Sequence, residues 1–156
     1  MNAIFEQMVE HFEQRQMHYR SEAEFSCLRL DFEGAVGTYH IAVWVDLGIK
    51  LCQLRCFAPV RVPEGCRPAV AEAVLRVNYG LLVGKFELNC DDGDLRLHVS
   101  HMLNDERFEE QILDRMVYGS LNTMDIYLPA FLSVIYANEI PKEAIRIAEA
   151  AVQTAS

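Results

Sequence analysis

The sequence has no run of lysine or arginine residues anywhere along its 156 positions. It carries 14 basic residues against 23 acidic ones, which gives a formal net charge of -9 at pH 7. Nucleic acids and anionic membrane surfaces bind proteins through clustered cations that displace counterions from phosphate groups. We therefore expect neither a nucleic acid nor a membrane surface to be a partner of this chain.

Long hydrophobic runs and targeting signals are lacking as well. The longest apolar stretch, Ile126 to Ala137, contains Pro129 and is shorter than the ~20 residues that a membrane-spanning helix needs, so it predicts a core helix. The first residues contain no basic segment followed by an apolar one, so we expect no export signal. The cysteines are odd in number and lie mostly in apolar segments, which favours buried thiols and a cytoplasmic location. They are Cys27, Cys52, Cys56, Cys66 and Cys90.

The chain also lacks a complete catalytic or ligand-binding motif. Residues 80–85 have glycines spaced too closely for a phosphate-binding loop and precede a strand, so we interpret them as a helix-to-strand turn. Residues 91–94 lack the alternating oxygen ligands of a calcium loop and predict a hairpin turn. Ser120 is not in a Gly-x-Ser-x-Gly elbow and is interpreted as a helix cap or break. We expect no catalytic residue, no metal and no cofactor.

Pairs of residues that could act together are better explained structurally. His98 and His101 are three apart on or near a strand, so their side chains leave on opposite faces. Cys52 and Cys56 share a strand face about 13 Å apart, too far for one metal ion or one disulfide, and are expected in the core. The acidic residues of the helix that follows are interpreted as its solvated face. They are Glu109, Glu110 and Asp114.

Hydrophobic spacing divides the chain into helices and strands. Helical spacing predicts helices over residues 2–19 and 69–82, from 106 onward with breaks or kinks at Gly119 and Pro129, and from Pro141 to the end. Alternation with a period of two predicts strands at about 27–33, 38–46, 50–58, 85–90 and 95–100. The fold class is therefore α+β, as one domain over residues 1–156 in the order α-β-β-β-α-β-β-α-α. We expect an antiparallel five-stranded sheet with helices packed mainly on one face.

The other face of this sheet is expected to be open and polar. Its residues are Arg29, Asp31, His40, Trp44, Gln53, Arg55, Lys85, Glu87, Arg96 and His98. Trp44 is a large aromatic side chain in this polar field, which is typical of a partner anchor, although a crossing helix could bury it. We predict partner binding at Trp44, Arg55 and His40.

The helix predicted over residues 69–82 has more apolar surface than one sheet contact uses. Besides its valine stripe it carries Leu75, Tyr79 and Leu82. Either a C-terminal helix or a second copy of the chain covers this stripe, so these residues are a candidate homodimer interface.

Three segments carry a resemblance to a known family. They are residues 62–64, the stretch 77–87 that leads from a helix into a strand opened by Gly-Lys-Phe, and the apolar stretch 121–131 with its continuation at 141–145. In these segments the chain resembles the YbjN family of bacterial proteins, which are similar in fold to type III secretion chaperones. The resemblance implies a regulator of sensory transduction and no catalytic residue. Secretion chaperones of similar fold are acidic homodimers that hold an unfolded segment of a partner.

Two functions remain open from the sequence. The first is a cytoplasmic homodimer that binds a protein partner of unknown identity, as a chaperone-like or regulatory module and not as an enzyme. The alternative is a small-ligand sensor or an uncharacterised enzyme. It predicts a pocket between the sheet and the C-terminal helices, lined by Met116, Tyr127 and Phe131.

Overall fold

A computed structural model describes residues 2–104 and 107–155 of the chain. Four α-helices and six strands follow the predicted order closely. They are α1 (Ala3–Gln14), β1 (Arg20–Glu22), β2 (Cys27–Glu33), β3 (Thr38–Asp46), β4 (Leu51–Phe57), α2 (Arg67–Gly80), β5 (Lys85–Leu88), β6 (Leu95–Met102), α3 (Glu110–Tyr136) and α4 (Pro141–Ala155). Two short 3₁₀ helices, Ala23–Phe25 and Glu64–Cys66, precede β2 and α2.

The strands form one antiparallel sheet in the order β1-β2-β3-β4-β6-β5. The expectation of five strands is wrong, because Arg20–Glu22 adds a sixth at the edge beside β2. Its three residues are polar and form no apolar alternation, so a pattern-based prediction misses them. Phe25 belongs to the 3₁₀ turn between these strands, which ends where Ser26 takes a left-handed φ of 49°.

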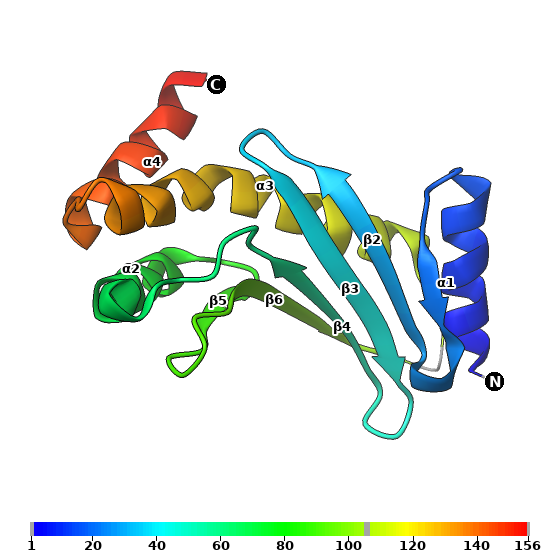
Figure 1. Cartoon of the computed structure of the whole chain (residues 1–156). Coiled ribbons are helices and arrows are strands. Elements are labelled where there is room, and N and C mark those ends of the chain that lie inside the picture. Colours follow the sequence, from blue (N-terminus) through cyan, green and yellow to red (C-terminus); the bar gives the residue numbers. More distant parts are fainter. Residues whose placement is uncertain (1, 105–106, 156) are drawn as a thin grey trace.

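All four helices lie on the same side of the sheet (Figure 1). Helix α3 passes behind the strands, α1 lies beside β1 at one end, and α2 and α4 lie together at the other end. Side chains of alternate strand residues fill the core between these layers, among them Leu28, Ile41, Val43, Leu54 and Leu97. The predicted α+β class, the antiparallel sheet and the parity of its strands are therefore confirmed.

The predicted breaks in the third helix are wrong, because α3 runs through Gly119 and Pro129 without interruption. Ser120 is buried inside this helix, where its hydroxyl donates a hydrogen bond to the Met116 carbonyl at 2.6 Å, so it is neither a cap nor a break. Pro129 costs one helical hydrogen bond, which burial of the neighbouring Phe131 in the core offsets. Among the described residues no helix has both the length and the apolar character needed to cross a membrane.

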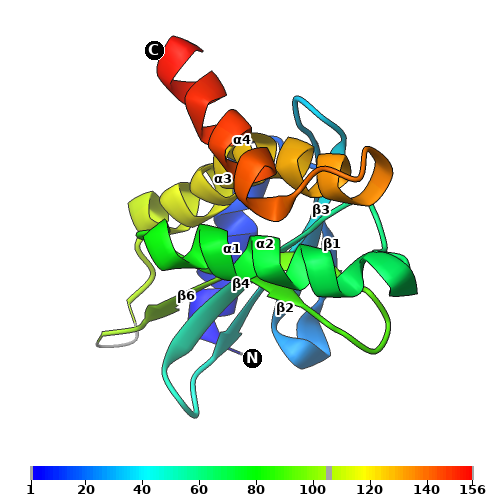
Figure 2. The same cartoon turned by 90° about the vertical axis from the view of Figure 1, so that its left-hand side faces the viewer.

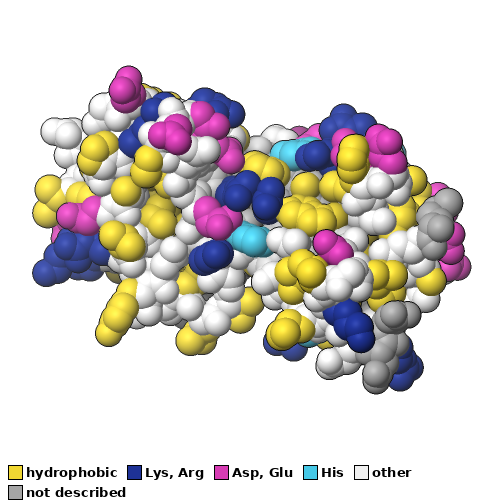
Figure 3. Space-filling model, turned by 90° about the horizontal axis from the view of Figure 1, so that it is seen from below, with side chains coloured by type: hydrophobic (Ala, Val, Ile, Leu, Met, Phe, Trp, Pro, Cys, Tyr) yellow, Lys and Arg dark blue, Asp and Glu magenta, His cyan; other side chains and the backbone are white. Residues whose placement is uncertain are grey.

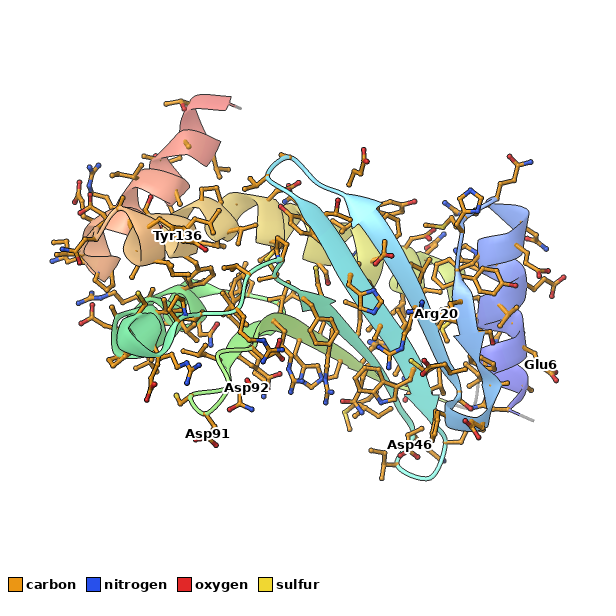
Figure 4. All side chains as sticks on the ribbon, viewed as in Figure 1. Glu6, Arg20, Asp46, Asp91, Asp92 and Tyr136 are labelled. Atoms are coloured by element: carbon orange, nitrogen blue, oxygen red, sulfur yellow. The ribbon has the colours of Figure 1, made fainter. Side chains whose placement is uncertain are left out.

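The predicted turns are confirmed by their backbone geometry. Gly84, between α2 and β5, has a φ of 78°, and Gly93, in the β5–β6 hairpin, has a φ of 82°. Glycine alone reaches such angles without strain. Asp91 and Asp92 lie at the outer tip of that hairpin (Figure 4), where the Asp92 carboxylate accepts a hydrogen bond from the Asp94 backbone.

A cluster of polar contacts joins α1 and its C-cap residue Arg15 to α3. His11 is 2% exposed, and its Nε2 lies 2.9 Å from the Asp114 carboxylate, which also pairs with Arg15 at 2.8 Å. Glu110 lies 3.6 Å from the other ring nitrogen of His11. The prediction that these acidic residues form a merely solvated face is therefore wrong for Asp114.

The pocket expected between the sheet and the C-terminal helices does not form around its three predicted residues. Phe131 is fully buried, with its ring 5.0 Å from that of Phe86, and Tyr127 packs against the same ring at 6.0 Å. Met116 alone of the three lines a groove, which lies between α3 and β6. The aromatic rings of Phe86, Tyr127 and Phe131 pack together where the pocket was expected.

Candidate protein-binding site on the open sheet face

The face of the sheet opposite the helices carries the predicted polar residues. Cross-strand pairs such as Arg29–Ala42, Ala42–Arg55 and Arg55–His98 place these side chains in rows across β2, β3, β4 and β6. Seen from this side, basic, acidic and histidine side chains gather in the middle of the molecule beside hydrophobic ones (Figure 3). No helix crosses this face in the described part of the chain, so the alternative of a buried Trp44 does not occur.

Trp44 and Arg55 form the centre of a shallow depression. The guanidinium carbon of Arg55 lies 4.5 Å from the centroid of the Trp44 ring, which is a cation–π contact. Ala42 stands directly opposite Arg55 on β3, and its small side chain leaves the guanidinium room to reach the ring. The depression has a volume of about 250 Å³. It is lined by Phe25, Cys27, Arg29, Ala42, Trp44, Arg55 and Phe57.

Arg55 has no anionic partner among the residues that the structure describes. Its Nε is buried and makes no hydrogen bond. Burial, followed by the nearby Arg96, lowers the pKa of Arg55 from its ordinary value. The guanidinium has no hydrogen bond or ion pair within the described chain, and the planar fork of an arginine matches a carboxylate.

Two ion-pair networks flank this depression and use up the other charges of the face. On one side Arg29 donates to Glu22 at 2.9 Å, and His40 contacts both Asp31 at 2.7 Å and Arg29 at 3.5 Å. His40, which is also predicted to bind the partner, is not one of the residues that line the depression, but it contacts Arg29, which lines it. The separation follows from strand geometry, since Trp44 lies four positions after His40 on β3, a distance of about 13 Å along the strand.

The second network surrounds Glu87 on β5. Its carboxylate accepts from Arg96 at 2.9 Å and lies 3.5 Å from the Lys85 ammonium and 3.3 Å from His98 Nδ1. Burial alone would raise the pKa of Glu87, but these cations, Arg96 above all, hold it below the usual value. Burial lowers the pKa of His98, whose Nε2 lies 3.0 Å from the Gln53 side chain.

The arrangement supports recognition of a ligand. The depression offers an unpaired guanidinium beside exposed apolar surface, which suits a segment carrying a carboxylate next to an apolar side chain. Among the described residues no group of three or more His, Cys, Asp or Glu side chains could hold a metal ion. Cys52 and Cys56 lie in the core as predicted, where burial raises the pKa of each thiol to about 12.

Five of the lining residues were not identified as binding residues from the sequence: Phe25, Cys27, Arg29, Ala42 and Phe57. Phe25 is 67% exposed at the mouth of the depression, because the 3₁₀ turn before β2 holds it there. Cys27 and Phe57 have the open-face parity of their strands, which is the signal that could have found them. Phe25 gives no such signal, because its position depends on the unpredicted strand β1.

The predicted interface stripe is uncovered in the described part of the chain, and it lies on α2 and on the turn that follows, because α2 ends at Gly80, before Leu82. Leu75, Tyr79 and Leu82 are 72%, 97% and 97% exposed. Helix α4 packs against other sides of α2 and α3, so the alternative that a C-terminal helix covers the stripe is wrong. Figure 2 shows α2 lying across the front of the molecule with its outer side free of other elements.

Comparisons with known proteins match most of the chain. A profile of the YbjN family, described as "Putative bacterial sensory transduction regulator", matches residues 6–133. Five chains of solved structures are similar. One is the crystal structure of YbjN, "a putative transcription regulator from E. coli", with a TM-score of 0.58 and 11% identity over 81% of this chain and 90% of that chain. Another, from the HopA1–SchA chaperone–effector complex, has a TM-score of 0.52 and 13% identity over 78% of this chain and 91% of that chain. These identities establish similarity of fold alone, and no curated protein matches the chain.

Proposed function

Because the chain belongs to the YbjN family, we propose that it is a non-enzymatic protein-binding module, chaperone-like or regulatory, that works in the cytoplasm as a homodimer. The family description names regulators of sensory transduction, and a chain of similar fold occurs in a chaperone–effector complex. Both fit a function in which the chain binds another polypeptide. Fold likeness does not by itself transfer that function, so the proposal depends on the site.

The observation that carries the proposal is the unpaired Arg55 stacked on Trp44. An acidic side chain of the partner pairs with the Arg55 fork, and an adjacent apolar side chain contacts the Trp44 ring and Phe25. Buried arginine and tryptophan are common centres of binding energy in interfaces. His40 acts indirectly in this proposal, because it contacts Arg29 at the edge of the depression.

The test starts from the protein purified from its own host without overexpression. Native mass spectrometry reads subunit count and bound species together. We expect a bound polypeptide, retained by the Arg146→Met variant on α4 and lost by Arg55→Met. Trp44 is the single tryptophan of the chain, so its fluorescence reports binding of a peptide from that polypeptide directly.

Two results would count against this site. Equal binding by the wild type, Arg55→Met and Trp44→Ala would place the partner elsewhere. A bound small molecule in place of a polypeptide would favour the sensor function.

The homodimer is proposed to form through the exposed stripe on α2. A helix face this apolar is costly to leave in water, and a two-fold axis lets the same stripe cover itself. Tyr79→Glu is expected to convert a dimer into a monomer in sedimentation experiments. Val152→Glu, which alters an exposed apolar residue on α4, is the matched control and should leave the dimer intact. A wild-type protein that stays monomeric at all concentrations contradicts the proposal.

A further inference from the structure

The sheet ends on one side in a strand that is only half paired. β5 covers β6 from Leu95 to His98 and no further, whereas β4 pairs with β6 along its whole length to Met102. The last part of β6, residues 99–102, is therefore a free edge. Gly84, which joins α2 to β5, lies beside His98 and Val99 at the point where the pairing ends.

The direction of the backbone groups along this edge follows from the ladder. Ala58 donates to the Leu95 carbonyl at 2.9 Å and Leu103 donates to the Lys50 carbonyl at 2.8 Å, so the odd-numbered residues of β6 bond to β4. In an antiparallel ladder the intervening residues turn both of their backbone groups to the other side. Ser100 and Met102 thus present two N–H and two C=O groups outward, and no described residue pairs with them.

A groove runs along this edge between β6 and α3. Its volume is about 640 Å³, and its apolar lining includes Val83, Val99, Ile112 and Met116. Among the described residues that line the groove, Arg115 is the only arginine, lysine, aspartate or glutamate. It has no ion-pair partner among residues 2–104 and 107–155, in a chain whose net charge is -9. The groove therefore complements a ligand that is apolar and carries a negative charge.

We propose that this edge binds an extended peptide segment of a protein partner by strand addition, as a seventh strand that continues the line of β5. Residues of the added strand opposite Ser100 and Met102 exchange backbone hydrogen bonds with them. The residues between point toward α3, because side chains alternate along a strand. Two of these residues, two positions apart, interact with the groove. One places an apolar side chain in it, and the other pairs an acidic side chain with Arg115. Main-chain bonds give the affinity and the alternate side chains give the selectivity.

A substitution at Ser100 isolates the backbone bonds. Its N–H points outward and makes no bond in the folded chain, so Ser100→Pro removes no internal hydrogen bond, and proline is tolerated at such edge positions. Ser100→Ala keeps the N–H and is the matched control. The probe is the capped peptide Thr-Val-Thr-Leu-Thr-Glu-Thr with a fluorescent label, measured by polarisation.

We expect the wild type and Ser100→Ala to bind the probe with the same affinity. The dissociation constant of Ser100→Pro should be higher by roughly tenfold or more, because a backbone hydrogen bond is lost and the ring hinders the added strand. N-methylation of the probe at alternate residues should weaken binding similarly, which tests the same bonds without altering the protein. Arg115→Gln should remove the preference for the Glu probe over its Gln counterpart. Arg55→Met should change nothing, which separates this site from the open-face site.

The proposal is overturned if the wild type does not bind the probe, or if neither Ser100→Pro nor N-methylation weakens binding. Loss of binding in Arg55→Met also overturns it, because the peptide would then lie on the open face. So does self-association of the wild type that Ser100→Pro abolishes, since a second copy would then occupy the edge.

Discussion

Replacing Arg55 by methionine should raise the stability of the protein while it removes partner binding. The buried Nε of Arg55 has no hydrogen-bond partner, and an unsatisfied buried donor costs about 1–3 kcal/mol. Methionine relieves that cost and keeps an unbranched apolar stem over the Trp44 ring. What it loses is the cation–π contact at 4.5 Å, which contributes about 0.5–1 kcal/mol at a partly exposed site.

The difference favours Arg55→Met by about 1 kcal/mol. For a domain of this size that raises the melting temperature by about 2–4 °C. Urea unfolding followed by circular dichroism measures the change, because Trp44 fluorescence would respond to the substitution itself. The matched control is Arg96→Met on the same face, which deprives Glu87 of its 2.9 Å hydrogen bond and should lower stability by about 1 kcal/mol.

A loss of more than about 1 kcal/mol in Arg55→Met would refute this reasoning, because it would show that the guanidinium stabilises the folded chain. Arg55 would then be a structural residue, and the argument that it is kept for a ligand would fail. Equal effects of Arg55→Met and Arg96→Met would refute it as well, since the two arginines differ in having a carboxylate partner.

Three further predictions concern the framework of the fold. His11→Ala should destabilise the protein by about 2 kcal/mol in urea unfolding, because Asp114 loses its 2.9 Å contact with a buried ring. The control, His18→Ala at an exposed position, should have little effect. Gly84→Ala should lower the free energy of unfolding by about 1–2 kcal/mol, since φ is 78° and the added Cβ would lie 2.9 Å from Val99. Gly119→Ala in α3 should stabilise by about 0.5–1 kcal/mol, because its Cβ would meet no atom within 4 Å beyond its chain neighbours and the helix backbone; thermal melts that rank the two variants alike would contradict this. His98→Gln should make the stability of the protein less sensitive to acid. Burial lowers the pKa of His98 below 6.5; Glu87 opposes this shift, and the neighbouring Arg55 and Lys85 add to it. In acid the unfolded chain therefore takes up a proton that the folded chain does not. Wild-type stability then falls as the pH drops below about 6.5, and an equal fall in the variant, from urea midpoints at about pH 7.5 and 5.5, would show that another group is responsible.

Local pattern was sufficient to predict that the four helices exist and in which order, the turns, and the face on which each residue of the five predicted strands lies. Strand side chains alternate strictly, so the apolar set of β3 fixes Trp44 on the opposite face, next to Arg55 of β4 once the two strands pair. The exposed stripe of α2 follows from helical spacing in the same way. Both candidate surfaces could therefore be named from the sequence, although His40 lies too far along β3 to line the depression.

Pattern could not predict features that depend on distant partners. Strand β1 is a strand only because β2 lies beside it, and its three polar residues carry no period of their own. Helix α3 continues through Gly119 and Pro129 because tertiary packing of its buried side outweighs their low helix propensity. The sequence predicts a solvated Asp114, because its contact with His11 forms only when α1 packs against α3.

The sequence by itself thus determined the order of the elements and the faces of its strands, because side-chain periodicity is a property of the local backbone. Only the tertiary structure decided which charges remain without a partner and which strand edge remains open. Arg55 and Arg115 differ from the paired arginines solely in what the fold places near them. The free end of β6 exists because β5 begins only at Lys85, opposite His98. Pairing depends on distances between residues remote in sequence, which no local pattern encodes.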